Sequence, residues 1–227
     1  MTTETQTPIV AAGPRWQRRK QARPQELLDA ALVEFVERGF SGARLEDIAR
    51  RAGCTKGTIF LYFEGKEDLF KSVVRQTMVP LLESAESLAD QHHGSAESLL
   101  AALLRHRWRG MMSTVASALP KLMFAEAGHF PDLARFYHDE VITRSRAPIE
   151  RAIRLGIANG EFREVDVEDV ARLALAPMLL AATWRHAFSR HLGGSDSLDR
   201  ESYLETSLEV LLRGLRRNVT SETPGHA

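Results

Sequence analysis

Apolar residues recur along most of the chain with the three-to-four-residue spacing of amphipathic helices. The clearest case lies between Pro24 and Gly39, where the spacing predicts a single helix. Its apolar positions are Leu27, Leu28, Ala31, Leu32, Phe35 and Val36. Proline suits the first turn of a helix and glycine suits the position just past its end. The two residues therefore mark the expected limits of this first helix.

Two shorter helices are predicted next. One covers residues 45 to 52 and is stopped by Gly53, which can take the left-handed conformation that a tight turn needs. Thr55 is expected to cap the other helix, with its hydroxyl accepting the backbone N–H of Thr58. This helix of about two turns is expected to end near Phe63. Two short helices joined by a glycine turn and laid across a longer one form the helix-turn-helix plan.

The rest of the chain also has helical periodicity, with no strand alternation and no internal repeat. A fourth helix is expected to start near Lys66 and to lead out of the small N-terminal domain. Glycine and proline divide the remainder into five candidate helices, at about 95 to 118, 120 to 127, 131 to 159, 167 to 191 and 199 to 217. Asp166 and Asp199 are the expected caps of the last two. The predicted fold class is all-α.

Composition excludes several classes of protein. The chain has 227 residues, of which 44% are hydrophobic and 26% charged, and this content supports one or two compact domains rather than a disordered chain. The single cysteine excludes a disulfide scaffold. No apolar run approaches the roughly 18 to 20 residues of a membrane span, and the N-terminus lacks a secretory signal pattern. We therefore expect a cytoplasmic protein without a membrane partner.

Charge is balanced in total but unevenly placed. The chain has 30 basic and 30 acidic residues, which argues against a uniformly basic surface for nucleic acid. No acid interrupts the basic residues between positions 15 and 23, which are Arg15, Arg18, Arg19, Lys20 and Arg23. We interpret residues 1 to 23 as a disordered basic arm that either attracts phosphates or is simply solvated.

One segment of about thirty residues carries a specific signature. It is GFSGARLEDIARRAGCTKGTIFLYFEGKEDLF, from Gly39 to Phe70. Its distinctive elements are Gly39-Phe40, Asp47-Ile48-Ala49, Ala52-Gly53, Lys56-Gly57-Thr58-Ile59, Tyr62-Phe63, Lys66-Glu67 and Leu69-Phe70. The segment closely resembles the DNA-binding signature of the tetracycline-repressor (TetR) family of transcriptional regulators. The resemblance implies a helix-turn-helix DNA-binding domain over residues 24 to 70 and a helical effector-binding and dimerisation domain over 71 to 217, with a disordered tail over 218 to 227.

The residue types of the third helix suit a helix that contacts bases in the major groove. A helix that enters the major groove must be thin where it approaches the bases, and Lys56, Gly57 and Thr58 offer a cation, a bare backbone and a small hydroxyl. Leu61 lies on the same side and could meet a thymine methyl group. Ile59 and Phe63 are four residues apart and are expected to anchor the helix inward.

The resemblance also implies contacts with the DNA backbone. Tyr62 would donate its hydroxyl to a phosphate and Lys66 would pair with another, while Thr55 could join them. At the start of the second helix, where many family members have threonine, this chain has Arg44, whose charge would serve the phosphate instead. Phe60 replaces a tyrosine that many members have, and it cannot donate a hydrogen bond.

The C-terminal half is expected to bind an apolar or amphipathic effector and to form a homodimer. Met and aromatic side chains of the middle helices could line an adaptable cavity or could be plain core; the candidates are Trp108, Met112, Met123, Phe124 and Tyr137. The resemblance implies that the last two helices pair across a twofold axis through their apolar faces; the candidates are Trp184, Leu204, Leu208 and Leu211. The dimer would bind a palindromic operator on double-stranded DNA.

Other chemistries receive little support. Cys54 is interpreted as a small hydrophobe that forms a staple with Ile59, because a redox sensor needs a resolving partner. Glu126 and His129 have the spacing of a helical metal pair but no third ligand at a telling distance, so no metal site and no cofactor is expected. No catalytic triad or phosphate-binding loop is present, and enzyme activity is not expected.

Two function classes remain. The favoured one is a ligand-responsive DNA-binding regulator that is released from its operator by an effector. The alternative is a helical protein that binds or sequesters a small molecule without specific DNA readout. The intact series Lys56, Gly57, Thr58, Tyr62 and Lys66 favours the regulator, and the departures at Arg44 and Phe60 favour the alternative.

Overall fold

The computed structural model describes residues 15 to 112, 115 to 188, 198 and 200 to 217. These residues are all-helical, as predicted, apart from an isolated bridge between Phe162 and Arg216. The helices are α1 (Arg15–Gly42), α2 (Leu45–Arg51), α3 (Lys56–Ile59), α4 (Lys66–Gln91), α5 (Ala96–Met112), α6 (Ala118–Glu126), α7 (Pro131–Tyr137), α8 (Arg144–Ala158), α9 (Val167–Ala187) and α10 (Glu201–Leu215). None of these helices is long and apolar enough to cross a membrane.

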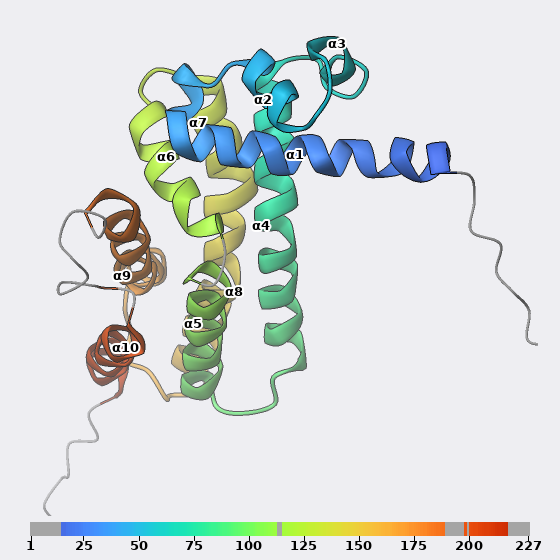
Figure 1. Ribbon diagram of the computed structural model, residues 1–227. Helices are drawn as coiled ribbons and strands as arrows, with labels where there is room; N and C mark the ends of the chain where they lie inside the picture. Colours follow the sequence, from blue (N-terminus) through green and yellow to red (C-terminus); the bar gives the residue numbers. More distant parts are fainter. Residues whose placement is uncertain (1–14, 113–114, 189–197, 199, 218–227) are drawn as a thin grey trace, which may run out of the picture.

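The helices are arranged around the long helix α4. At one end of the molecule α1 crosses α4, and α2 and α3 lie at this same end (Figure 1). From there α4 runs along the body beside α5 and α8, and α9 and α10 lie on the far side of α5 and α8. Because α4 begins in the helix-turn-helix unit and ends in the helical body, it links the two halves directly.

Most of the predicted helices are present with shifted ends. The candidate over 131 to 159 forms one continuous rod, in which a π-helical stretch over His138–Thr143 joins α7 to α8. The candidate over 95 to 118 ends at Met112, and a 3₁₀ turn over Val115–Ser117 leads into α6. Asp166 caps α9 as predicted, since its Oδ1 accepts the backbone N–H of Asp169 at 2.9 Å. Asp199 lies outside the described residues, and the residue before α10 is Arg200.

The start of α1 differs from the expected disordered arm. The helix begins at Arg15, so residues 15 to 23 continue it and Pro24 lies inside it. Arginine, lysine, glutamine and alanine are good helix formers, and they extend a helix without any apolar periodicity. Gly39 interrupts the regular helix as predicted, because its φ of 76° is left-handed.

The hydrophobic core consists of two clusters that do not follow the expected domain boundary. The first joins α1, α2, α3 and the first half of α4, and it also contains Leu119 and Leu122 of α6 and Leu133 of α7. The second joins the end of α4 to α5, α8, α9 and α10. The helix-turn-helix unit is thus packed on α6 and α7, so its position depends on the position of those helices.

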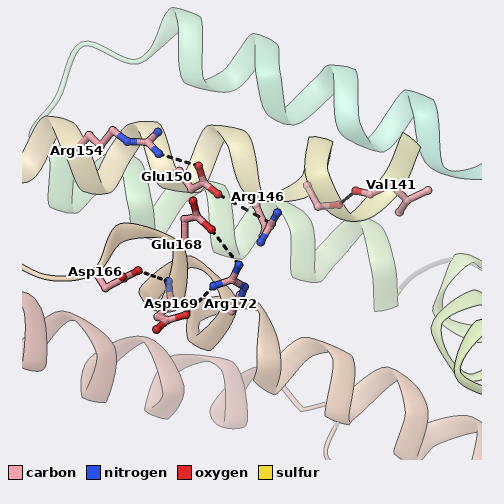
Figure 2. Close-up of polar contacts among 9 residues, drawn as sticks. Val141, Arg146, Glu150, Arg154, Asp166, Glu168, Asp169 and Arg172 are labelled. Carbon is pink, nitrogen blue, oxygen red and sulfur yellow. Dashed lines mark hydrogen bonds and ion pairs between the residues drawn. The ribbon is translucent and has the colours of Figure 1, made fainter. Parts of the chain in front are cut away.

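Polar contacts stabilise the first turns of α9 and the polar face of α8. Figure 2 shows Asp166 directed at the first turn of α9 and Arg172 between Glu168 and Asp169, with Nη-to-carboxylate distances of 3.0 and 2.6 Å. On α8, Arg154 binds Glu150 at 2.9 Å in the same view. Each of these contacts lies within one helix, and such pairs contribute little energy individually.

Two helical glycines offer a matched test of this packing. A Cβ at Gly156 of α8 would lie 2.1 Å from Cδ2 of the buried Phe162 ring, whereas a Cβ at Gly214 of α10 would meet nothing within 4 Å. We predict that Gly156→Ala lowers the free energy of unfolding by about 1 to 3 kcal/mol through overpacking. Gly214→Ala should raise it by up to about 1 kcal/mol through helix propensity. Urea denaturation measures both, and equal effects would contradict the described packing.

Candidate DNA-binding surface and effector cavity

Helix α2 is fixed to α1 by a cluster of charges. The Glu34 carboxylate, with a side chain only 2% exposed, binds Arg38 at 2.6 Å and Arg51 at 3.2 Å. Asp47 of α2 lies 3.8 Å from Arg38 of α1 and also pairs with Arg50 of its own helix at 2.7 Å. Because Glu34 is buried and paired from both helices, removing either arginine would leave a poorly compensated charge. The cluster therefore holds α2 in a defined orientation on α1.

The turn between α2 and α3 is tight, and α3 is shorter than predicted. Gly53 has a φ of 63°, as the turn requires. Helix α3 covers only Lys56–Ile59, after which i-to-i−3 hydrogen bonds take over, for example from Tyr62 N to Ile59 O at 3.0 Å. The predicted side-chain cap is wrong: the N–H of Thr58 binds the carbonyl of Thr55 at 2.9 Å, and the two threonine hydroxyls bind each other at 3.1 Å.

The outer side of α3 has the exposure that a DNA-reading surface requires. Lys56, Gly57 and Leu61 are exposed, with Leu61 at 77%, and Thr58 is partly exposed. Ile59 and Phe63 are buried and anchor the segment, as predicted. Leu61 contributes little to the core, and its exposed side chain is accessible to an apolar group of a partner.

Within α2 and α3, Lys56 has an internal partner. Its Nζ lies 2.7 Å from Oε1 of Glu46, and both side chains are about half exposed, at 49% and 55%. The hydrogen bond from Lys56 lowers the pKa of Glu46 below its usual range. We expect Glu46 to compete with DNA for Lys56, because a phosphate and this carboxylate would attract the same ammonium group.

Lys66 does not have the arrangement of the predicted phosphate contact. Its ammonium donates to the backbone carbonyls of Phe40 at 2.8 Å, Ser41 at 3.3 Å and Ala43 at 3.1 Å. It also lies 4.7 Å from the centroid of the Phe40 ring. An ammonium has three donors, and all of them are occupied. Burial lowers the pKa of Lys66, and the Glu126 carboxylate partly offsets this effect. Lys66 thus provides hydrogen-bond donors for the backbone carbonyls at the C-terminal end of α1.

A second charged group binds the same end of α1 from the helical body. Glu126 is the last residue of α6 and is only 8% exposed. Its carboxylate accepts the backbone N–H of Ser41 at 3.1 Å and the Ser41 hydroxyl at 2.7 Å. Glu126 and His129 have the spacing of a helical metal pair, although no metal site was expected there. The structure instead makes it the hydrogen-bonding link between α6 and the end of α1.

The remaining predicted DNA contacts lie on the same end of the molecule. Arg44 precedes α2 and is exposed, and it makes no side-chain capping bond. Thr55 is exposed, and Tyr62 is partly exposed with its ring against the first core cluster. Phe60 is 51% exposed beside Lys56, whose Nζ lies 5.9 Å from the ring centroid. The DNA-binding roles of these residues remain predictions.

The helical body contains an apolar cavity of about 260 Å³. Its walls come from α4, α5, α6, α7, α8, α9 and the π-helical stretch between α7 and α8. The apolar lining includes Met78, Met111, Met123, Phe124, Leu175 and Met178. Phe124 is 69% exposed and Ile142 is 41% exposed, so these residues form the open side of the cavity. Flexible methionine side chains allow such a cavity to adapt its shape to a ligand.

Three of the five residues predicted to bind a ligand line this cavity. Met123, Phe124 and Tyr137 line it as predicted, but Trp108 and Met112 do not. Both are buried in the second core cluster, and the Trp108 ring lies 6.3 Å from that of Tyr203 in α10. The face of α5 that reaches the cavity is one residue earlier, at positions 107 and 111. Arg107 was missed because a charged residue gives no signal in an apolar pattern.

The predicted dimer residues also fall into two groups: two are buried in the chain's own core and two are only partly buried. Leu204 and Leu208 are each 3% exposed and belong to the chain's own core, so their assignment to a dimer surface is wrong. The apolar stripe of α10 is covered by α5 and α9. Leu211 is partly buried against the same core, and Trp184 is partly exposed with its ring 4.6 Å from that of Phe188. Exposed apolar side chains on α9 and α10 are instead Leu173, Leu180 and Val210.

The described residues form neither a metal-binding cluster nor a disulfide. Among those residues no group of three or more His, Cys, Asp and Glu side chains could hold a metal ion. Cys54 is a free thiol, partly buried against the first core cluster, which agrees with its interpretation as a small hydrophobe. The site therefore consists of an exposed helix-turn-helix surface and an apolar cavity in the helical body.

This combination defines a class of protein: a helix-turn-helix DNA-binding protein with a helical ligand-binding domain. Two family models match the chain. Residues 27 to 73 match the model for bacterial regulatory proteins of the tetR family, and residues 90 to 191 match a tetracyclin repressor-like C-terminal domain. The chain belongs to the TetR family of transcriptional regulators, whose members are not enzymes.

Individual relatives agree with this assignment. The HTH-type transcriptional repressor KstR2 of Rhodococcus jostii is 26% identical over 198 residues, covering 86% of this chain and 92% of the relative. The fatty acid metabolism regulator protein of Bacillus subtilis is 33% identical over 89 residues, and the match spans 38% of this chain and less than half of the relative, 46%. A crystal structure of FadR from Bacillus subtilis in complex with stearoyl-CoA has the same fold, with a TM-score of 0.69, 22% identity and coverage of 84% and 98% of the two chains.

The arrangement of Lys66 predicts a structural rather than a phosphate-binding role. Lys66→Met should lower the free energy of unfolding by about 1 to 3 kcal/mol, because partly buried carbonyls lose their donors. Lys71→Met is the control: Lys71 pairs with Glu67 within α4 at 3.0 Å and lies 5.8 Å from the Phe136 ring centroid, and its loss should change stability by less than about 1 kcal/mol. Chemical denaturation and DNA titration are both needed. Unchanged stability with a reduced salt dependence of DNA binding would restore the phosphate assignment.

The pair between Lys56 and Glu46 predicts that Glu46 restrains DNA binding. Glu46→Gln should strengthen binding to all DNA sequences and steepen the salt dependence by roughly 0.9 for one added phosphate contact. Glu205→Gln is the matched control, since Glu205 is 49% exposed in an ion pair with Arg105 and the net charge changes equally. Fluorescence titration over a salt series measures both slopes. Equal effects of the two variants would show that only net charge matters.

Proposed function

We propose that the protein is a ligand-responsive repressor that binds a palindromic operator as a homodimer and is released by a small-molecule effector. The coarse function follows from the family, and the exposed Lys56, Gly57 and Leu61 support base reading. Since its proposed partner is double-stranded genomic DNA, we place this function in the cytoplasm. The observation that carries the proposal is the physical connection between the cavity and the DNA-reading end.

That connection runs through α6. Met123, Phe124 and Ala127, at the C-terminal part of α6 and just after it, line the cavity. Glu126 stands among them and holds Ser41 at the end of α1 through two hydrogen bonds. A ligand that moves this part of α6 therefore moves the support of α1. Because α2 and α3 are packed on α1, the orientation of the reading surface would change with it.

A second connection runs through α4. Met78 of α4 lines the cavity, and Lys66 at the start of the same helix binds the end of α1. The effector and DNA would oppose each other if each preferred a different position of α4 and α6. Such coupling is reciprocal and typically amounts to about 1 to 3 kcal/mol. DNA binding would then weaken by a factor that equals the loss of effector affinity on DNA.

The exposed apolar side chains of α9 and α10 support the homodimer. Leu173 and Leu180 are seven residues apart on α9 and so lie on one face, with exposures of 64% and 49%. Val210 on α10 is 68% exposed. An identical surface on a second copy would cover these side chains by twofold symmetry. The resulting dimer would present two α3 segments to half-sites separated by one helical turn of DNA or a multiple of it.

Footprinting on the DNA upstream of the gene and its neighbours, over a salt series, tests the proposal. We expect a protected palindrome and a steep loss of affinity with salt. Leu180→Asp should produce monomers in sedimentation and lose the palindromic footprint. The control Leu155→Asp, at an α8 leucine that is 41% exposed, should remain dimeric. Sequence-blind binding by the wild-type protein would favour the alternative of a small-molecule binding protein.

A further inference from the structure

The cavity contains a buried cation that its apolar walls do not explain. Arg107 of α5 lines the cavity together with Tyr137 of α7. Its Nε is completely enclosed and has no hydrogen-bond partner, while the side chain as a whole keeps the partial exposure of a cavity-lining group. Within the part of the chain that the structure covers, no carboxylate pairs with Arg107. Arginine stays charged in proteins, so an uncompensated positive charge faces an apolar space.

Electrostatics makes this arrangement costly without a ligand. Burial is the largest influence on Arg107 and lowers its pKa, and Tyr137 is the other group that acts on it. Burial also raises the pKa of Tyr137 to about 12, so its hydroxyl keeps its proton at neutral pH and can donate a hydrogen bond. A buried charge without a counter-ion is unfavourable, and a buried donor without an acceptor adds to the cost. An anion at this position would relieve both.

The shape of the guanidinium indicates which anion fits. Its planar set of N–H groups matches the two oxygens of a carboxylate, and such paired hydrogen bonds are among the strongest in proteins. The Ser145 hydroxyl, also in the cavity wall, already donates to the Val141 carbonyl at 2.5 Å. The hydrogen-bond donors left for a ligand on this wall are therefore those of Arg107 and the hydroxyl of Tyr137.

The remaining lining defines the rest of the ligand. Met78, Met111, Met123 and Met178 offer adaptable apolar contacts, and Phe124 borders the open side. The volume of about 260 Å³ lies just below the roughly 300 to 1,000 Å³ of pockets that hold drug-sized ligands. A short apolar body with one charged end would fill this space.

We infer that the effector is a small amphipathic monocarboxylate, whose carboxylate pairs with Arg107 and accepts a hydrogen bond from Tyr137 while its apolar body lies among the methionines. This inference rests on the proposed function, because it names the effector of that same cavity. The inferred ligand differs from stearoyl-CoA, with which a similar protein was crystallised, because a thioester has no carboxylate at the end of its acyl chain.

Calorimetric titration of the full-length protein with matched ligands tests the head group. Decanoate, 1-decanol, methyl decanoate and decanoyl-CoA share a ten-carbon chain, and fatty acids from hexanoate to dodecanoate locate the preferred length. We expect decanoate to bind at least about tenfold more tightly than the alcohol and the ester, because only it satisfies Arg107. Equal affinity for decanoate, 1-decanol and methyl decanoate, or a preference for decanoyl-CoA, would overturn the inference.

Variants of α5 and α7 test the residues. Arg107→Met should abolish the preference for decanoate over decanol, and it should fold with an equal or higher melting temperature because an uncompensated charge is removed. Tyr137→Phe should weaken decanoate binding several-fold and leave decanol unchanged. Arg109→Met is the control: this exposed arginine of α5 does not line the cavity, and it should bind decanoate as the wild type does. A retained preference in Arg107→Met would overturn the assignment.

Operator binding in the presence of each ligand separates this inference from the proposed function. Release of the operator by decanoate in the wild type, but not in Arg107→Met, supports both. Release by decanol or decanoyl-CoA without release by decanoate would leave the repressor proposal standing and overturn the carboxylate assignment. Tight decanoate binding that depends on Arg107 but leaves operator affinity unchanged would confirm the ligand class and overturn the effector role.

Discussion

The position of the DNA-reading surface depends on how the end of α1 is held. After the left-handed Gly39, the chain turns through residues 40 to 43, where backbone groups would be left without helical partners. Lys66 binds the carbonyls of this turn and Glu126 binds its N–H and hydroxyl at Ser41. The two charged groups belong to α4 and α6, so both helices bind the same turn. The positions of α2 and α3 depend on that turn, because both helices come directly after it in the chain.

The same two helices form walls of the cavity, and this shared use explains how a small ligand could act on distant DNA contacts. Close-packed interiors transmit displacement because they have little free volume. The first core cluster extends from α1 through Phe70 and Leu69 of α4 into α6 and α7, and Tyr137 belongs both to it and to the cavity lining. A long flexible linker between domains would have separated the two sites, and the continuous packing joins them.

Charged residues in this protein are used in two distinct ways. Lys66 and Glu126 have their hydrogen bonds within the chain and Glu34 has ion pairs with two arginines, and all three serve the fold. Lys56 has an exposed partner that it can exchange, and Arg107 has no carboxylate partner among the described residues. Charge alone therefore does not identify a binding residue in this chain. The informative feature is whether a charged group already has a partner within the chain that it cannot readily exchange.

Local chemistry made much of this protein predictable from sequence. Apolar periodicity determines the all-α fold and most helices, glycine at positions 39 and 53 determines the left-handed turns, and Asp166 determines the start of α9, since each depends on a few neighbouring residues. Only the tertiary structure decided which face of a helix meets which neighbour. It placed Leu204 and Leu208 inside, assigned Lys66 to the fold and brought Arg107 into an apolar cavity, because these outcomes depend on residues far apart in the chain.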